Sequence, residues 1–204
     1  MGRPELHSAG AILDGARAAV LADSSATITE IAATSGAPAG SIYHRFGSRD
    51  ALLAEMWIRA VARSQDRFIA AIDSANEPFN AAVAAGLSIF DFARDECDDA
   101  RLLVSLRREQ LIRSPLPPRL ANRLRKLNQP VEAAIARMAR DLYGTSSPLN
   151  RQRMALAVID IPYGAIRRFL IADSSPPGSL RPLVRRSICA VLDSEPPPGS
   201  GRRS

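Results

Sequence analysis

Apolar residues recur at every third or fourth position along most of the chain, and no stretch alternates apolar and polar residues convincingly. This spacing puts the apolar side chains on one face of an α-helix, whereas alternation would indicate a strand. Prolines separate the patterns, because a helix tolerates proline only in its first turn. The chain is therefore predicted to be all-α. We expect about nine helices, at residues 5–22, 28–35, 38–44, 49–74, 78–95, 98–113, 119–142, 148–173 and 179–193.

Two prolines interrupt this scheme. Pro130 and Pro162 fall inside expected helices, and each is predicted to kink its helix or to divide it. Three further prolines open the last segment, residues 194–204, whose other residues are mostly Ser, Gly and Arg. This composition does not form a packed core, so we expect a disordered tail.

The composition indicates a globular protein without a membrane span. Its 204 residues suffice for one or two domains, and the chain has no run of about 18 apolar residues. The amino terminus lacks the apolar core of a signal peptide, so we expect a cytoplasmic protein. Cys97 and Cys189 are too few for a disulfide framework and are expected to be buried, reduced thiols.

No pattern indicates catalysis. The only histidines are His7 and His44, and the chain has no glycine-rich phosphate loop, nucleophile elbow or metal-ligand spacing. We therefore expect no enzyme activity, no cofactor and no metal.

The segment TITEIAATSGAPAGSIYHRFGSRDALLAE, which begins at Thr27, predicts two short helices and the start of a long one. Thr27 and Glu30 have the spacing of a capping box, which starts a helix at the next residue. Gly36 ends that helix, because glycine adopts the left-handed conformation of a tight turn. Pro38 is expected at the first position of the second helix, and Ser48 is expected to cap the long one.

Two short helices joined by a glycine turn describe a helix-turn-helix. The second helix buries Ile42, and its outward face carries Ala39, Ser41, Tyr43 and His44. Small residues let a helix lie deep in the major groove, while Tyr and His reach phosphates or base edges. Residues 1–76 contain seven Arg against eight acidic residues, so DNA binding there must depend on shape and placed contacts.

The same residues resemble the DNA-binding domain of TetR-type transcriptional regulators. The pattern consists of Thr27, Ile31-Ala32, Ser35-Gly36, Gly40-Ser41-Ile42-Tyr43, Phe46 and Ser48-Arg49-Asp50-Ala51-Leu52. The resemblance covers about residues 6–57. It implies a DNA-binding domain at residues 1–48, with the motif at about 28–47, and a helical effector-binding and dimerisation domain at 49–193.

The resemblance implies nine DNA-contact candidates, which are Thr27, Pro38, Ala39, Gly40, Ser41, Tyr43, His44, Arg45 and Arg49. Tyr43 and the two arginines are expected at phosphates, as is the helix that Thr27 caps, and Ser41 and His44 are expected at base edges. Pro38 and Ala39 replace polar residues usual in the family, so DNA shape or a thymine methyl is expected to carry more of the specificity. The alternatives are a partly buried Tyr43 ring, solvated arginines, and a surface histidine without a role.

An effector cavity among the middle helices is also implied. Candidate lining residues are Phe68, Phe90, Leu106, Gln110, Met138 and Tyr163. The alternative is that each belongs to the ordinary core. Trp57, close behind the motif, is interpreted as a core residue that could relay effector binding.

Two carboxy-terminal helices are predicted to form a homodimer interface. The helix from residue 148 is apolar on nearly every side, which indicates burial on more than one face, and Gly164 would permit a close helix approach. The last helix presents one apolar stripe from Leu180 to Val191. The alternative is that both helices belong to the core of a monomer.

A basic stretch runs from Arg101 to Arg140, where nine Arg and Lys126 face only two acidic residues. We interpret it as a solvated face that pairs with nearby acids, namely Glu96, Asp98, Asp99 and Asp141. The alternatives are a surface for an anionic effector, such as an acyl thioester of coenzyme A, and an extra contact with flanking DNA.

The combined expectation is a homodimeric, ligand-responsive transcriptional regulator. Two recognition helices would enter successive major grooves of a palindromic operator. A small-molecule effector would change their spacing through the long helix from Arg49. Repression is the commoner mode in the family, and activation is the alternative with the same fold. A second alternative is a protein-interaction module built on a degenerate helix-turn-helix.

Overall fold

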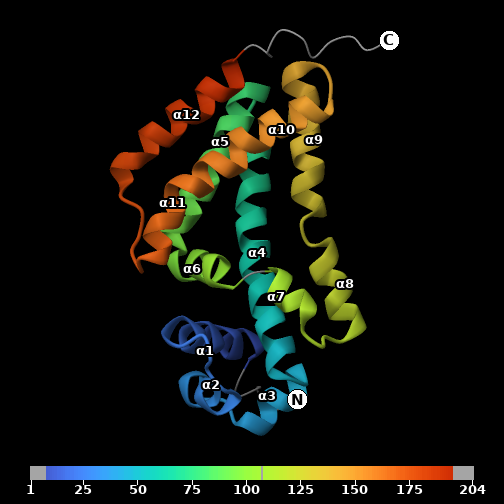
Figure 1. Cartoon of the computed structure of the whole chain (residues 1–204), viewed down its shortest axis with the longest axis vertical. Coiled ribbons are helices and arrows are strands. Elements are labelled where there is room, and N and C mark those ends of the chain that lie inside the picture. Colours follow the sequence, from blue (N-terminus) through green and yellow to red (C-terminus); the bar gives the residue numbers. More distant parts are fainter. Residues whose placement is uncertain (1–7, 107, 195–204) are drawn as a thin grey trace, which may run out of the picture.

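The computed structural model describes residues 8–106 and 108–194, and this part of the chain is helical, with no strand. The all-α prediction is therefore confirmed. The helices form an elongated molecule with a small domain at one end and a larger helical domain above it (Figure 1).

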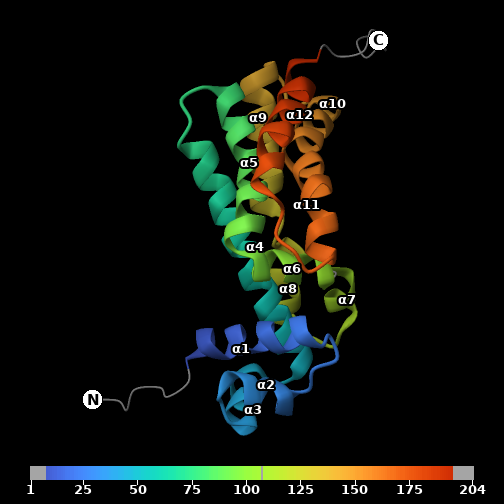
Figure 2. The same ribbon diagram turned by 90° about the vertical axis from the view of Figure 1, so that its left-hand side faces the viewer.

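Three short helices and the start of a long one build the small domain. They are α1 (Ala9–Ala22), α2 (Ile28–Ser35), α3 (Ala39–Phe46) and α4 (Arg49–Asp73). Figure 2 shows that α4 continues from the small domain along the larger one, so a single helix connects the two.

The remaining helices form the larger domain. They are α5 (Pro78–Asp95), α6 (Cys97–Ser105), α7 (Arg108–Arg113), α8 (Pro118–Lys126), α9 (Gln129–Tyr143), α10 (Pro148–Ala155), α11 (Ile161–Ile171) and α12 (Arg181–Asp193). A π-helical turn, η1 (Leu156–Asp160), joins α10 to α11, and a 3-10 turn, η2 (Gly178–Leu180), precedes α12.

Three of the expected helices are divided in the structure. Pro130 lies in the first turn of α9, where its missing N–H costs no hydrogen bond, and the division predicted there is confirmed. The π-helical turn η1 ends directly before the first turn of α11, which contains Pro162, because proline cannot donate to the carbonyl one turn earlier. The expected helix at 98–113 was wrong as one element, since the chain becomes extended at Leu106.

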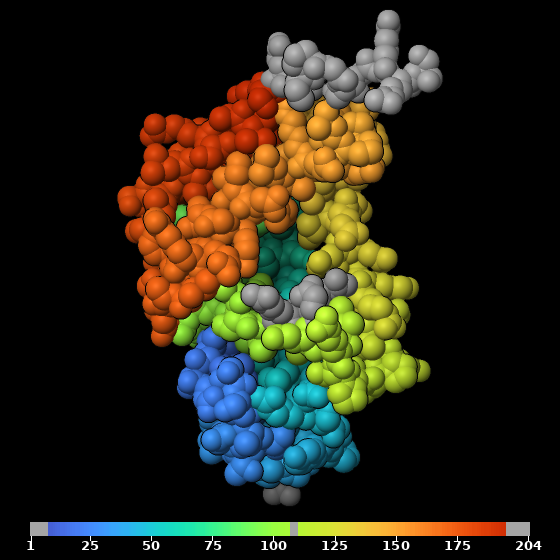
Figure 3. Space-filling model, viewed as in Figure 1, coloured from blue at the N-terminus to red at the C-terminus, as the bar shows by residue number. Residues whose placement is uncertain are grey.

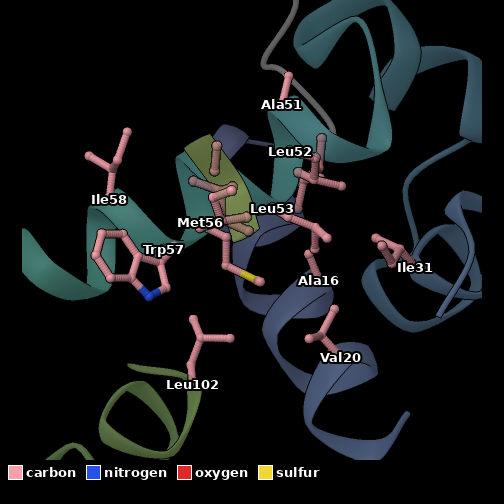
Figure 4. Packing of buried hydrophobic residues seen from close by; sticks show 14 of the residues in the cluster. Ala16, Val20, Ile31, Ala51, Leu52, Leu53, Met56, Trp57, Ile58 and Leu102 are labelled. Atoms are coloured by element: carbon pink, nitrogen blue, oxygen red, sulfur yellow. The ribbon is translucent and has the colours of Figure 1, made fainter. Parts of the chain in front are cut away.

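Buried apolar residues form two clusters. The first fills the small domain and the first half of α4, and it includes Leu102 of α6 and Leu124 of α8. Figure 4 shows Trp57 and Met56 of α4 above Leu102. The second cluster lies in the larger domain. Because the first cluster includes residues of α6 and α8, a displacement of these helices would change the packing of the core of the small domain.

Several expectations fall outside these elements. The start of the helix expected at 5–22 and residues 195–204 of the expected tail lie outside the described residues. Cys97 and Cys189 are free thiols but only half-buried, less than predicted. Within residues 8–106 and 108–194, no helix is both long and apolar enough to cross a membrane.

Candidate functional site

The first helix of the motif begins at the predicted capping box. The Thr27 hydroxyl oxygen accepts a hydrogen bond from the Glu30 amide at 3.3 Å, and the Glu30 carboxylate accepts one from the Thr27 amide at 2.6 Å. The Thr27 amide and, at 2.7 Å, the Thr27 hydroxyl both donate to the Glu30 carboxylate and hold the pKa of Glu30 below its ordinary value. Gly36 ends the helix with φ of +70°, as predicted. Local hydrogen bonds therefore fix the start of this helix, and a glycine in the left-handed conformation ends it.

The second helix, α3, starts one residue later than expected. Pro38 is its N-cap instead of its first residue, and the Pro38 carbonyl accepts a hydrogen bond from the Ser41 amide at 2.9 Å. Gly47, with φ of +79°, ends α3. Ser48 caps α4 as predicted, because its hydroxyl accepts a hydrogen bond from the Ala51 amide at 3.1 Å.

The outward face of α3 carries the residues expected at DNA. Ile42 is fully buried beneath the helix, while Gly40, Ser41, His44 and Arg45 are exposed. The Tyr43 ring is 53% exposed and lies outside the core. Pro38 and Thr27 are also exposed. Ala39 is half-buried and packs against the first cluster, so less of it faces outward than the pattern predicts. The exposed side chains can donate and accept hydrogen bonds and carry positive charge, which suits base edges and phosphates.

Arg49 has a role within the chain. Its Nε donates to the Ala26 carbonyl at 2.7 Å, and Nη2 donates to the Ser24 carbonyl at 2.8 Å. These bonds join the start of α4 to the loop before α2. Sequence reasoning assigned Arg49 only to phosphate or to solvent, since a bond to a backbone carbonyl 23 residues away leaves no local signal.

An apolar cavity of about 170 Å³ lies among α4, α5, α6, η1 and α11. Its walls are Ser64, Ile89, Phe92, Ala100, Leu103, Val104, Ile159, Tyr163, Ile166 and Leu170. Figure 3 shows the face of the larger domain hollowed between α11 and α9, with α4 visible at the floor. The cavity supplies apolar contacts and two hydroxyl groups, from Ser64 and Tyr163.

Of the six expected lining residues, the structure places only Tyr163 at this cavity. Phe68, Phe90 and Met138 are buried within the second cluster. Leu106 packs against the first cluster, and Gln110 is exposed. Sequence reasoning missed the other nine walls because helical spacing indicates burial but not which buried faces leave space between them.

Trp57 joins α4 to the end of α6. Its indole is buried, as expected, and Nε1 donates to the Leu106 carbonyl at 3.1 Å. The position between the motif and the larger domain is compatible with a relay, which stays a prediction.

The basic stretch is partly paired, with one of the expected acids, Asp98, and with three acids that were not expected. Arg101 contacts Asp98 at 3.6 Å and also pairs with Asp173. Further along, the stretch pairs with α4, through Arg123 and Glu55 at 2.6 Å and through Arg137 and Asp73 at 3.1 Å. The expected pairing of Asp99 and Glu96 with the stretch was wrong, because Asp99 pairs with Arg17 of α1 and Arg63 of α4, and Glu96 contacts Arg63 at 3.8 Å.

Apolar side chains remain exposed on the two carboxy-terminal helices. Leu156, Ile171 and Leu183 are exposed in the single chain, and a Cβ placed on Gly164 would meet no atom within 4 Å. Val184 and Ile188 of the predicted stripe are instead buried in the chain's own core. The free apolar surface therefore lies beside that stripe.

Comparisons with known proteins agree with this arrangement. Residues 12–56 match the family model of bacterial regulatory proteins of the tetR family. The fold is similar to that of the fatty acid degradation regulator FadR from Bacillus halodurans, with a TM-score of 0.70, 14% identity, 93% of this chain and 100% of that chain covered. No curated protein sequence matches the chain.

Two further solved structures have a similar fold. One is the transcriptional regulator FadR from Bacillus subtilis in complex with stearoyl-CoA, with a TM-score of 0.69, 11% identity, and 91% of this chain and 98% of that chain covered. The other is a TetR-family transcriptional regulator from Bordetella parapertussis 12822, with a TM-score of 0.66 and 19% identity. The match covers 91% of this chain and 94% of that chain. At these identities the likeness establishes the fold of the chain.

Proposed function

We propose that this chain, whose residues 12–56 match the family model of bacterial regulatory proteins of the tetR family, is a transcriptional regulator that binds a palindromic operator as a homodimer and releases the DNA when a small apolar effector binds. The observation that carries the proposal is α3, which buries Ile42 and exposes Ser41, Tyr43, His44 and Arg45 at one end of the molecule. A helix with this distribution fits the major groove.

The effector occupies the apolar cavity. Its volume of about 170 Å³ lies below the roughly 300–1,000 Å³ typical of sites for drug-sized ligands. Among the residues that the structure describes, the walls carry no charged side chain, and the two hydroxyl groups of Ser64 and Tyr163 suit one neutral polar group. We therefore expect a compact, uncharged molecule, unlike the stearoyl-CoA bound to FadR from Bacillus subtilis.

Selection of bound sequences from random duplex DNA, at a stated salt concentration, tests the proposal. Enrichment of a palindrome, together with a mass of two chains in solution, is the expected result. If the folded protein enriches no sequence with or without candidate effectors, the operator-binding proposal fails. A protein-interaction module then becomes the better explanation of the motif. Release by an acyl-CoA thioester, but not by small neutral compounds, would contradict the effector class.

Two variants test the contact face. Arg45→Ala should lower affinity for the selected operator and reduce the magnitude of the salt dependence by about 0.9 for each phosphate that the side chain neutralises. Ser41→Ala should instead relax the preference at particular base pairs, by about 1–3 kcal/mol per site. Arg140→Ala, at an exposed position of α9 in the larger domain, is the matched control and should change neither property. Equal effects of Arg45→Ala and Arg140→Ala would contradict the assigned face.

A further inference from the structure

Asp99 of α6 is an acidic residue in an unusual place. Of the charged residues that the structure describes, it alone is buried, with 1% of its surface exposed. Its carboxylate accepts hydrogen bonds from Arg17 of α1 and, at 2.8 Å, from Arg63 of α4. The three side chains therefore join the small domain, the connecting helix and the larger domain at one point.

The electrostatics keep Asp99 ionised. Burial opposes the charge, but the hydrogen bonds from Arg63 and Arg17 outweigh it and hold the pKa of Asp99 below its ordinary value. A buried ion pair contributes little net stability compared with apolar packing, yet breaking one partner leaves an uncompensated charge. Such a contact therefore fixes the position of α6 against α1 more strictly than apolar packing would.

The adjoining face of α6 forms a wall of the apolar cavity. Ala100 directly follows Asp99 and lines the cavity with Leu103 and Val104. Ser64, which follows Arg63 on α4, lines it as well. On the far side, Arg101 ties α6 to Asp173, just after α11. A ligand or a larger side chain that enters the cavity consequently pushes against α6, the helix that carries Asp99.

We propose that Asp99 is a positioning residue through which α6 transmits occupancy of the apolar cavity to the DNA-binding domain by way of Arg17. This proposal rests on the proposed function, because it assigns the regulation of the same cavity. A shift of α6 moves the carboxylate away from Arg17, and α1 is then no longer attached to the larger domain at this point.

The test replaces the unidentified effector with a larger side chain. Ile166→Trp, from α11, fills the cavity from the wall opposite α6, and Ala100→Leu fills it from α6 itself. The measurement is amide hydrogen exchange of α1 in the full chain without DNA. In the native background, filling the cavity should speed exchange of α1 by about fivefold or more, the usual lower range of coupling between sites. In the Arg17→Gln background the same substitution should change the exchange rate of α1 less than about twofold.

Further variants separate coupling from a merely structural role. Arg17→Lys keeps a positive charge beside Asp99 and should restore part of the response. Arg59→Gln is the matched control, because it breaks the 2.5 Å pair between Arg59 of α4 and Asp14 of α1 without removing a contact of Arg17 or of α6. It should leave the response intact. Protection of α9 checks the fold, and Asp99→Asn, which breaks the contact from the α6 side, should abolish the response in the same way.

Equal responses in the native and Arg17→Gln backgrounds would overturn the proposal, and so would no response to either cavity-filling substitution in a folded protein. The exchange experiment contains no DNA. Failure to enrich a palindrome would therefore remove the operator without changing this result, and failure of the exchange response would leave operator binding standing.

Discussion

Gly15 sets how closely α1 and α2 approach each other. A Cβ at this position would lie 2.4 Å from Cβ of Ser35 and 2.5 Å from its Cα, so backbone would have to move. Gly15→Ala should therefore destabilise the protein by about 1–3 kcal/mol, as overpacking does. Urea unfolding measures the change. Gly10→Ala in the same helix is the matched control, since its new Cβ would meet only the Ser8 hydroxyl at 3.7 Å. It should be neutral or stabilise by up to about 1 kcal/mol, and equal destabilisation by both variants would contradict the argument.

At the residue scale, sequence predicts those contacts that are made within a few positions. The Thr27–Glu30 capping box, Gly36 in its left-handed turn and the Ser48 cap each follow from neighbours in the chain, and each is confirmed. Asp99 could not be assigned in this way. Its partner Arg17 lies 82 residues away, and the sequence contains many other arginines that could equally pair with Asp99.

The attachment of α4 depends on Arg49, which joins it to the loop before α2. Arg49→Gln removes the donors to the Ser24 and Ala26 carbonyls, and Ala26 is buried. An unsatisfied buried carbonyl costs about 1–3 kcal/mol, which should appear as a lower free energy of unfolding. Operator affinity should fall because α3 is held less firmly, while the salt dependence should stay near its native value. A slope reduced in magnitude by about 0.9 per site would show instead that Arg49 contacts phosphate. Arg45→Ala is the comparison, because it should reduce the magnitude of the salt dependence and leave the free energy of unfolding near its native value.

At the element scale, the apolar period predicts the type and order of the helices. It predicts where an expected helix is divided only if a proline lies at the division. Pro130 and Pro162 marked two interruptions correctly. The sequence between α6 and α7 has no proline or glycine, and α6 ends where the chain becomes extended at Leu106, whose carbonyl accepts a hydrogen bond from Trp57. A tertiary contact thus decides this boundary, and local sequence does not contain it. The cavity escapes prediction for the same reason, since it depends on how five elements are spaced.

At the scale of the whole molecule, the exposed apolar residues of α11 and α12 lie in the domain opposite α3. Ile171 and Leu183 are 57% and 51% exposed in the single chain. A homodimer that covers them would place two copies of α3 at a fixed separation, which a palindrome requires to be about 34 Å or a multiple of it. One small module gives weak binding, so operator affinity should depend on this surface.

Leu183→Glu tests that dependence. A charge introduced into the covered surface should raise the dimer dissociation constant at least about tenfold, which corresponds to about 1.4 kcal/mol. Sedimentation at micromolar concentration measures it. Operator binding should then become weaker and change from one step to two, because each chain would occupy its half-site separately. Ile112→Glu on α7, an apolar residue 37% exposed outside this surface, should leave both properties unchanged. A native protein that sediments as one chain, or a Leu183→Glu variant that still dimerises normally, would place the interface elsewhere, and the spacing of the recognition helices would then need another origin.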